Sequence, residues 1–151
     1  LEEILICDNA GAPLSSVPEA RLIHGQGIEG DRYFNGQGTF SKALQEKGDY
    51  EVTLIAREEI DNFNATCKLG YTAHHFRRNL LTSNIDLNNL VGNKFKIGSA
   101  ILLGIRLCEP CAHLAKSLGP EIMDRMVHKA GLRAIIKTSG IISINCNIER
   151  C

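Results

Sequence analysis

The sequence predicts a mainly β protein, with a barrel-like, mostly antiparallel β-fold and a few short helices. About seven or eight short apolar or β-branched runs are separated by turn residues such as Gly, Asn and Pro, which is the pattern of short antiparallel strands. Strand-like and helix-like segments do not alternate along the chain, and no repeat of fixed period is present. A parallel βαβ architecture is therefore disfavoured, and we expect one domain over residues 1–151, closed in the manner of a barrel.

The N-terminal half is expected to supply four strands and one helix. The predicted strands are Leu1–Cys7, Val17–Ile23, Glu51–Ala56 and Phe76–Thr82, each with apolar or β-branched content. Arg57–Leu69 has Ile60, Phe63 and Cys67 at helical spacing, and the following Gly70 would end that helix. Residues 35–48 are polar and contain glycines, so we expect an irregular excursion there.

The C-terminal half is expected to continue the sheet and to add two helices. Residues 86–92 read as a turn, and the helices are expected over 112–118 and from Pro120 to Gly131. The predicted strands are 94–97, 100–105, 132–137 and 141–144.

A glycine-rich segment, Gly25–Tyr33, has three glycines in its first six residues. Such a segment can bring backbone close to a ligand while directing Asp31 and Arg32, although a plain surface loop has the same composition. It matches the dinucleotide pattern G-x-G-x-x-G only nominally, because no helix is expected after it. A Gly-x-Ser-x-Gly elbow is absent, so a serine hydrolase is disfavoured.

Charge and hydropathy exclude several classes of partner. Lys and Arg together number 17, as do Asp and Glu, so no overall field attracts nucleic acid or an anionic membrane. No apolar run approaches the roughly 20 residues that span a bilayer, and the start Leu1-Glu2-Glu3 does not have the form of a secretion signal. The six cysteines are unevenly spread, which favours reduced thiols in a cytoplasmic protein over a disulfide framework.

The stretch from Arg106 to Leu114 is the strongest candidate for chemistry. It joins a predicted strand to a predicted helix, with Pro110 just before the helix and Cys111 at its start. A helix N-terminus and nearby arginines favour the thiolate form of such a cysteine. Cys111 is therefore a candidate soft, anionic sulfur at the end of a strand.

The spacing Cys108-x-x-Cys111 leaves other readings open. A zinc site would need two more ligands, for which His74, His75 and His113 are available, but no second paired motif has the spacing of structural zinc. A dithiol redox pair would lack the usual strand–helix–strand setting. Either cysteine could also be a small buried side chain, a reading that suits Cys108 on the strand better than Cys111.

Arginines at glycines and strand ends form the second candidate group: Arg32, Arg77, Arg78, Arg106 and Arg133. Together they could hold a phosphorylated ligand through bidentate hydrogen bonds, and Asn79 could read an amide or ring edge beside them. The histidines His24 and His128 and the cysteines Cys7, Cys67, Cys146 and Cys151 show no partner pattern and are interpreted as surface or packing residues.

Five short segments, taken in their order along the chain, resemble a stand-alone MOSC domain. This module is named for the C-terminus of molybdenum cofactor sulfurase. The matching segments are Gly30-Asp31-Arg32-Tyr33, Phe76-Arg77-Arg78-Asn79-Leu80, residues 86–92, residues 106–114 and Gly131-Leu132-Arg133-Ala134. One departure lies near the C-terminus, where Asn145-Cys146 replaces the frequent Gly-Asp turn. Asn tolerates the left-handed conformation that such a turn requires.

The resemblance implies a β-barrel-like fold and a pocket for the molybdenum cofactor, a molybdopterin with a phosphate group. It implies that Cys111 binds molybdenum or carries sulfur, that Arg32, Arg77 and Asn79 line the pocket, and that Asp31 orients Arg32. Arg133 is expected to contribute to cofactor binding as well.

The resemblance implies one of two activities, each with its own partner proteins. Some relatives reduce N-hydroxylated small molecules with the help of electron-donor proteins, whereas others are fused to cysteine desulfurase-like domains and deliver sulfur. A cofactor carrier without turnover and a thiol-redox or zinc domain based on Cys108 and Cys111 are the alternatives.

Overall fold

Two mostly antiparallel sheets form the centre of the structure. The structure is a computed structural model that describes the backbone of residues 1–151 and all side chains except those of residues 44, 45 and 47. The strands of the larger sheet are β1 (Glu3–Ile6), β2 (Ser15–Val17), β5 (Val52–Ala56), β6 (Leu80–Thr82), β7 (Lys94–Ile97), β8 (Ala100–Leu107), β9 (Leu132–Thr138) and β11 (Ile148–Arg150). The strands of the smaller sheet are β3 (Glu19–Ile23), β4 (Gly27–Ile28) and β10 (Gly140–Ser143).

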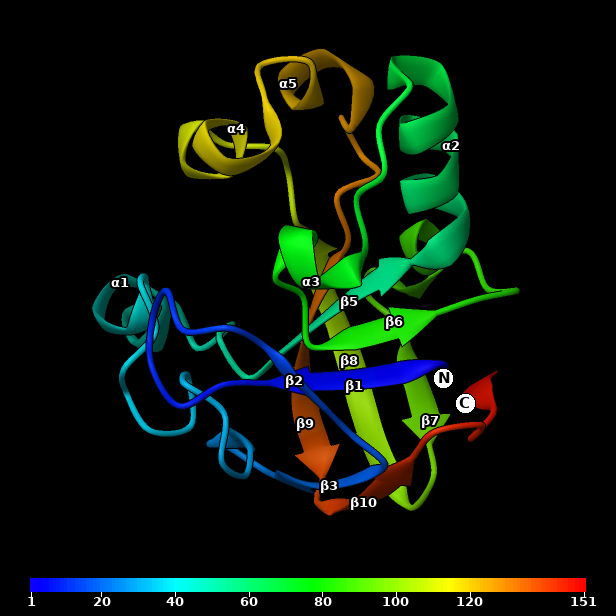
Figure 1. Cartoon of the computed structure of the whole chain (residues 1–151). Coiled ribbons are helices and arrows are strands. Elements are labelled where there is room, and N and C mark those ends of the chain that lie inside the picture. The colour runs from blue at the N-terminus through cyan, green and yellow to red at the C-terminus, as the bar shows by residue number, and fades with distance from the viewer.

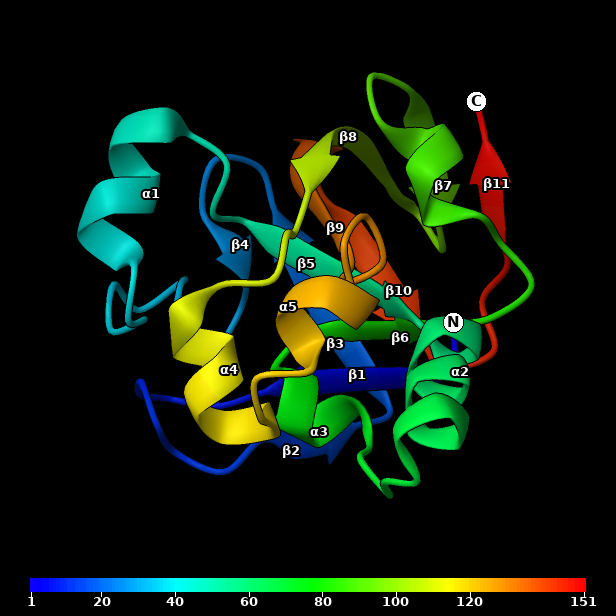
Figure 2. The same cartoon turned by 90° about the horizontal axis from the view of Figure 1, so that it is seen from above.

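The helices are short and gather mainly on one side of the larger sheet (Figure 1). They are α1 (Ser41–Lys47), α2 (Arg57–Cys67), α3 (Ala73–Phe76), α4 (Ala112–Leu118), α5 (Ile122–Arg125) and the 3₁₀ helix η1 (Leu87–Leu90). Viewed from above, α2, α3, α4 and α5 lie over β1, β5 and β6, while α1 stands apart at the side of the molecule (Figure 2). No helix in the described part of the chain has both the length and the apolar character needed to cross a bilayer.

The larger sheet has the order β11-β7-β8-β9-β5-β6-β1-β2, and the smaller has the order β10-β3-β4. All neighbours pair antiparallel except β5 and β6, which are parallel and are joined through α2 and α3. Parallel pairing requires a crossover of a dozen or more residues, usually helical, and α2 with α3 provide it. The mainly β, mostly antiparallel class predicted from the sequence is therefore confirmed.

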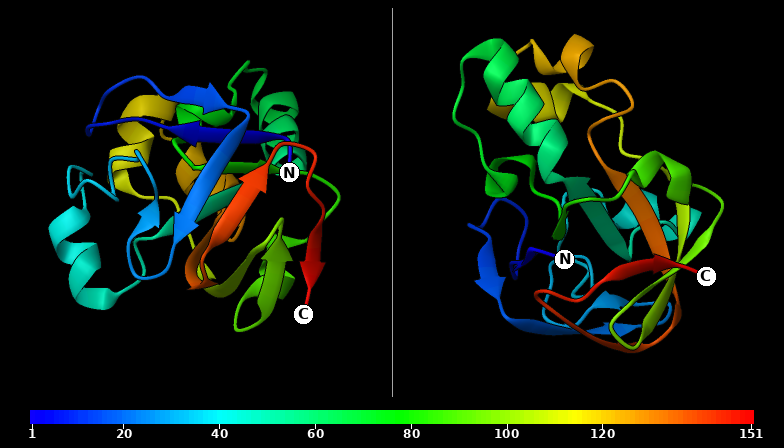
Figure 3. Two further views of the ribbon diagram at one scale, coloured as in Figure 1. Left: turned by 90° about the horizontal axis from the view of Figure 1, so that it is seen from below. Right: turned by 90° about the vertical axis from the view of Figure 1, so that its right-hand side faces the viewer.

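The predicted barrel-like closure is wrong, because the sheets are not closed into a barrel. The larger sheet has two free edges, β2 and β11, and the smaller sheet lies beside it as a separate element (Figure 3). Pro18 explains the break, because the predicted strand Val17–Ile23 is divided there into β2 and β3. Proline has no N–H to donate to a ladder, so the chain leaves the larger sheet at Pro18 and β3 pairs with β10 and β4 instead.

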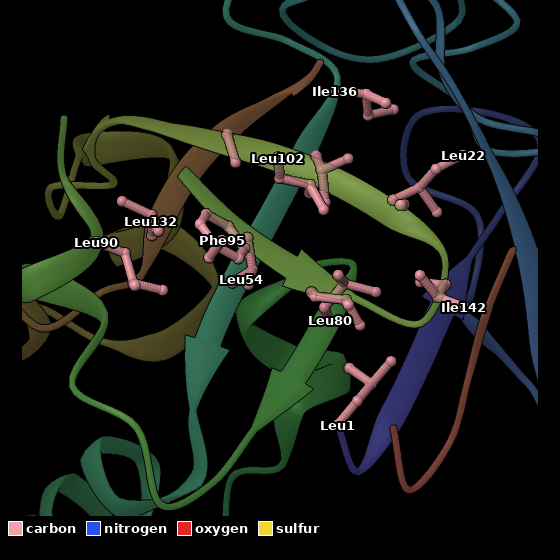
Figure 4. Close-up of a cluster of buried hydrophobic side chains, with 14 of the residues drawn as sticks. Leu1, Leu22, Leu54, Leu80, Leu90, Phe95, Leu102, Leu132, Ile136 and Ile142 are labelled. Carbon is pink, nitrogen blue, oxygen red and sulfur yellow. The ribbon is translucent and has the colours of Figure 1, made fainter. Parts of the chain in front are cut away.

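A buried apolar cluster joins the two sheets (Figure 4). Leu22 and Ile142 come from the smaller sheet, and Leu54, Leu102 and Ile136 come from the larger one, each without exposed surface. A second cluster packs the helices onto the sheet's other face; its members include Ile55, Ile60, Phe63, Phe76, Leu118 and Ile122. Because both faces are covered, β5 and β6 are buried along their whole length, and the strand 51–56 is found where it was predicted.

Three further predictions differ from the structure. The segment predicted as the strand Phe76–Thr82 begins with Phe76 as the last residue of α3, continues with the left-handed Arg77 (φ 56°), and becomes β6 only at Leu80. The excursion predicted over 35–48 contains α1, and the helix predicted from Pro120 to Gly131 is reduced to α5, followed by turns. Asn145 adopts the left-handed conformation expected of it, with φ 69°.

Candidate functional site

A cavity of about 320 Å³ lies beside the larger sheet and is bounded by α3, α4 and the start of α1. All five arginines singled out in the sequence line it, and we call them the arginine set: Arg32, Arg77, Arg78, Arg106 and Arg133. Cys108, Glu109 and Cys111 line the same cavity. The tertiary structure therefore brings together segments that are distant in sequence and that the sequence could not place relative to one another.

Arg32 is held in the cavity wall by three protein acceptors. Its Nη1 donates to Asp31 Oδ1 (3.1 Å) and to Cys7 Sγ (3.5 Å), and its Nη2 donates to the carbonyl of Arg77 (3.0 Å). Asp31 is buried and also accepts from the backbone N–H groups of Cys7 and Tyr33. Asp31 therefore contacts the Arg32 guanidinium directly and itself lies behind the cavity wall.

Arg77 is also engaged with the protein. Its Nη1 donates to the carbonyl of Ala12 (2.9 Å) and its Nη2 donates to Cys7 Sγ (3.5 Å). Cys7 therefore accepts hydrogen bonds from two members of the arginine set. The sequence analysis interpreted Cys7 as a packing residue, and no local signal marks its role, because it depends on the end of β1 lying beneath two distant arginines.

The other three arginines have fewer protein partners. Arg78 Nε donates to the carbonyl of Ala130 (2.9 Å), and Arg106 Nε donates to Asp49 Oδ2 (2.5 Å). Arg133 Nη1 is buried and has no hydrogen-bond partner among the described residues. Within the same part of the chain, carboxylates form ion pairs with Arg32 and Arg106 but not with Arg77, Arg78 or Arg133. The five guanidinium groups therefore outnumber the nearby carboxylates, Asp31, Asp49 and Glu109, and Arg133 keeps an unused buried donor.

Asn79 does not line the cavity, contrary to what the resemblance implied. It is 1% exposed, and its Oδ1 accepts from the N–H (3.2 Å) and the hydroxyl (2.9 Å) of Thr53. Its Nδ2 donates to the carbonyl of Leu5 (3.3 Å). With all these partners inside the protein, Asn79 ties β1 and β5 together below the cavity, and Thr53 is the residue of this pair that reaches the lining.

The two motif cysteines occupy different environments. Cys108 is 4% exposed and its N–H donates to the carbonyl of Gly131 (2.8 Å), whereas Cys111 is exposed and precedes the first residue of α4. The helix predicted over 112–118 matches α4. Both thiols are free, and Cys111 is the one accessible to solvent and to a ligand entering the cavity.

Glu109, which lies between the two cysteines in the sequence, is hydrogen-bonded to His128. The His128 N–H donates to Glu109 Oε2 (2.9 Å), and His128 Nδ1 lies 2.6 Å from Oε1. Burial acts to raise the pKa of Glu109, but the hydrogen bonds and charge of His128 outweigh it and hold that pKa below its ordinary value. The lowered pKa favours the ionised form of Glu109, two residues before Cys111. No group of three or more His, Cys, Asp or Glu side chains suited to a metal ion occurs among the described residues.

The fold and the cavity define a class of protein: a mainly β domain with a cationic, cysteine-bearing cavity suited to an anionic ligand. The family model of the MOSC domain matches residues 24–149, nearly the whole chain. The chain therefore belongs to the MOSC domain family. A search of curated proteins found no match.

Solved structures with this fold include bacterial proteins of low sequence identity. The crystal structure of the YuaD protein from Bacillus subtilis is 18% identical with a TM-score of 0.79, covering 99% of this chain and 93% of that one. The crystal structure of YiiM from Geobacillus stearothermophilus is 11% identical with a TM-score of 0.73, covering 99% of this chain and 73% of that one. The crystal structure of YiiM from Escherichia coli is 19% identical with a TM-score of 0.68, covering 100% and 70%. At these identities the likeness establishes the fold.

Proposed function

We propose that this chain binds the molybdenum cofactor in the cavity, with Cys111 as the molybdenum ligand or sulfur carrier. The observation that carries the proposal is that an exposed cysteine shares one cavity with the unpartnered, buried Nη1 of Arg133. A buried charged donor without a partner is costly, and a phosphate oxygen is an acceptor that would satisfy it.

The side chains present fit the chemistry of this cofactor. Arg78, Arg106 and Arg133 would hold the phosphate, because they retain the most unused guanidinium donors. Arg32 and Arg77, whose Nη atoms are engaged with the protein, would contribute positive charge and a fixed wall. The Cys111 sulfur is a soft donor of the kind that molybdenum accepts.

When bound, the cofactor would supply two-electron redox chemistry at its metal. The residues of this chain would bind and orient it, and the substrates we propose are N-hydroxylated small molecules, reduced with electrons from donor proteins. Delivery of sulfur by Cys111, loaded by a cysteine desulfurase partner, is the other activity that the same thiol would permit. In both activities Cys111, exposed at the start of α4, would hold the metal or the transferred sulfur.

The thiol-redox alternative has one observation in its favour, since Cys108 and Cys111 line the same cavity. It predicts a reversible disulfide between them and no dependence on molybdenum. The zinc alternative predicts zinc bound to the same two thiols. Elemental analysis and thiol titration of protein made in a host that synthesises the cofactor would separate these three readings.

The test of the proposal compares wild type, Cys111→Ala and Cys146→Ala, the last altering a half-buried cysteine that does not line this cavity. We expect molybdenum near one per chain and turnover of an N-hydroxylated compound with supplied electron donors for wild type and Cys146→Ala. Cys111→Ala should lose turnover with about 1 kcal/mol or less of lost stability, as expected for an exposed side chain. Wild-type turnover by Cys111→Ala would overturn the assignment, and cofactor binding without any turnover would establish a carrier.

A further inference from the structure

His75 is an exposed residue that lines the cavity, and two contacts with the protein hold its ring. It is the third residue of α3, and its Nδ1 accepts a hydrogen bond from the backbone N–H of Thr72 (3.0 Å). This is the part of a capping box in which the side chain reaches back to the start of the helix. The sequence analysis considered His75 only as a spare zinc ligand.

This contact decides the tautomer. A backbone N–H can only donate, so Nδ1 of His75 must be the unprotonated ring nitrogen. In the neutral ring the proton then lies on Nε2, which has no hydrogen-bond partner among the described residues. The imidazole of this cavity-lining residue therefore keeps one N–H donor that the described residues do not use.

The surroundings keep the ring in place. Tyr71 packs against it with ring centroids 5.2 Å apart, and Tyr71 is in turn fixed to α2 by two hydrogen bonds with the side-chain amide of Asn64 (2.9 and 2.7 Å). Phe76, the next residue, is fully buried and anchors α3 beside α4 (Figure 2). A donor held on both sides in this way loses little conformational entropy when it binds a ligand.

We propose that His75 is a ligand-binding residue that donates its Nε2–H to an oxygen of an anionic group bound in the cavity. The inference rests on the proposed function and identifies a donor for that site outside the arginine set. His75 and Arg77 are two residues apart in the chain and both line the cavity, so one ligand can contact the imidazole and lie in the field of the guanidinium. The phosphate of the cofactor and the oxygen of a substrate offer this same chemistry.

Three substitutions of His75 distinguish its role as a hydrogen-bond donor to the ligand from its role in capping α3. His75→Gln keeps an acceptor for the Thr72 N–H and retains N–H donors, and His75→Glu keeps the cap without a donor, since Glu and Gln are both usual at this position of a capping box. His75→Ala removes both. Ser117→Glu places a carboxylate elsewhere on the same cavity lining and measures the effect of charge alone.

The first measurement is calorimetric titration of the cofactor-free protein with inorganic phosphate. We expect His75→Gln to bind within about threefold of wild type and His75→Glu to bind at least about tenfold more weakly, the size of one lost hydrogen bond to a charged group. Ser117→Glu should lose clearly less than His75→Glu. Equal loss in the two Glu variants, or unchanged binding in His75→Glu, overturns the proposal.

The second measurement is the ¹⁵N spectrum of the His75 ring, which should show the proton on Nε2 and a shift of that N–H on adding phosphate. A proton on Nδ1 overturns the proposal. In cofactor-loaded protein, lower molybdenum content in His75→Glu identifies the cofactor phosphate as the acceptor, and a raised KM at equal cofactor content identifies the substrate oxygen. If wild type carries no molybdenum but phosphate binding still depends on His75, the proposed function fails and this inference stands.

Discussion

Arg106 on β8 and Arg133 on β9 are directly opposite each other in the larger sheet, and both side chains line the cavity. Like charges at opposed positions of a ladder are destabilising. Asp49 offsets the charge of Arg106 through its contact with Nε, but Arg133 has no such carboxylate among the described residues. We therefore expect the two facing cations to destabilise the empty domain and a bound anion to relieve that repulsion.

Arg133→Gln tests this trade-off. Removing one of two opposed cations should leave the free energy of unfolding unchanged or raise it by about 0.2–1 kcal/mol. Cofactor retention should fall about ten- to a hundredfold, because a charge-assisted contact contributes about 1.5–3 kcal/mol. Thermal unfolding and molybdenum content measure the two effects. Arg21→Gln, on β3 and outside this cavity, is the control; a clear loss of stability in Arg133→Gln alone would contradict the assignment.

Arg77→Ala should behave differently, because Arg77 supports the fold as well as the cavity. The substitution removes the hydrogen bonds of the Arg77 guanidinium with the Ala12 carbonyl and with Cys7 Sγ. We therefore expect the free energy of unfolding to fall by about 1–3 kcal/mol. Cofactor retention should weaken at the same time. Denaturant unfolding of the cofactor-free protein separates the two losses, and an unchanged midpoint would show that these contacts are not stabilising.

The six thiols should differ in their rates of alkylation. Cys111 and Cys151 are exposed, whereas Cys7 and Cys108 are buried, so a reagent at pH 7 should modify the first two before the last two. Mass spectrometry of the folded, cofactor-free protein reads the order. Labelling of Cys108 as fast as Cys111 would remove the distinction between a packing thiol and a reactive one.

Glu51 should make stability depend on pH. It is 6% exposed, and its Oε2 accepts from the N–H groups of Ile136 (2.8 Å) and Gly25 (3.3 Å). Burial raises the pKa of Glu51 above its ordinary value of 4.5, although these hydrogen bonds act in the opposite direction.

The sign follows from proton linkage. The folded carboxyl keeps its proton at pH values at which the unfolded chain has lost it, so the contribution of Glu51 to stability is greatest below its ordinary pKa. That contribution is lost as pH rises through the raised value. Glu51→Gln should therefore gain stability relative to wild type as pH rises from 4 towards 7, measured by unfolding at each pH. A difference that stays constant with pH would contradict the raised pKa.

The sequence by itself determined most strands, the extent of α4 and the family. Periodic apolar residues identify β1, β5, β7, β8, β9 and β10 because each pattern is local. The motif residues Asp31, Arg32, Arg77, Cys111 and Arg133 were found as candidates from residue type and order along the chain. The structure differs at the start of the predicted strand Phe76–Thr82, because Thr72 and His75 cap the short helix α3, which extends to Phe76.

Only the tertiary structure decided which of these residues share a site and what each one contacts. Arg106 and Arg133 are neighbours because β8 and β9 pair antiparallel. Asn79 does not line the cavity because its side chain is hydrogen-bonded to Thr53 and Leu5. Whether an arginine retains free donors depends on carbonyl groups brought to it from distant segments, as with Ala12 at Arg77 and Ala130 at Arg78. Such contacts depend on how the whole chain packs, and for that reason no pattern in the sequence distinguishes the engaged arginines from the free ones.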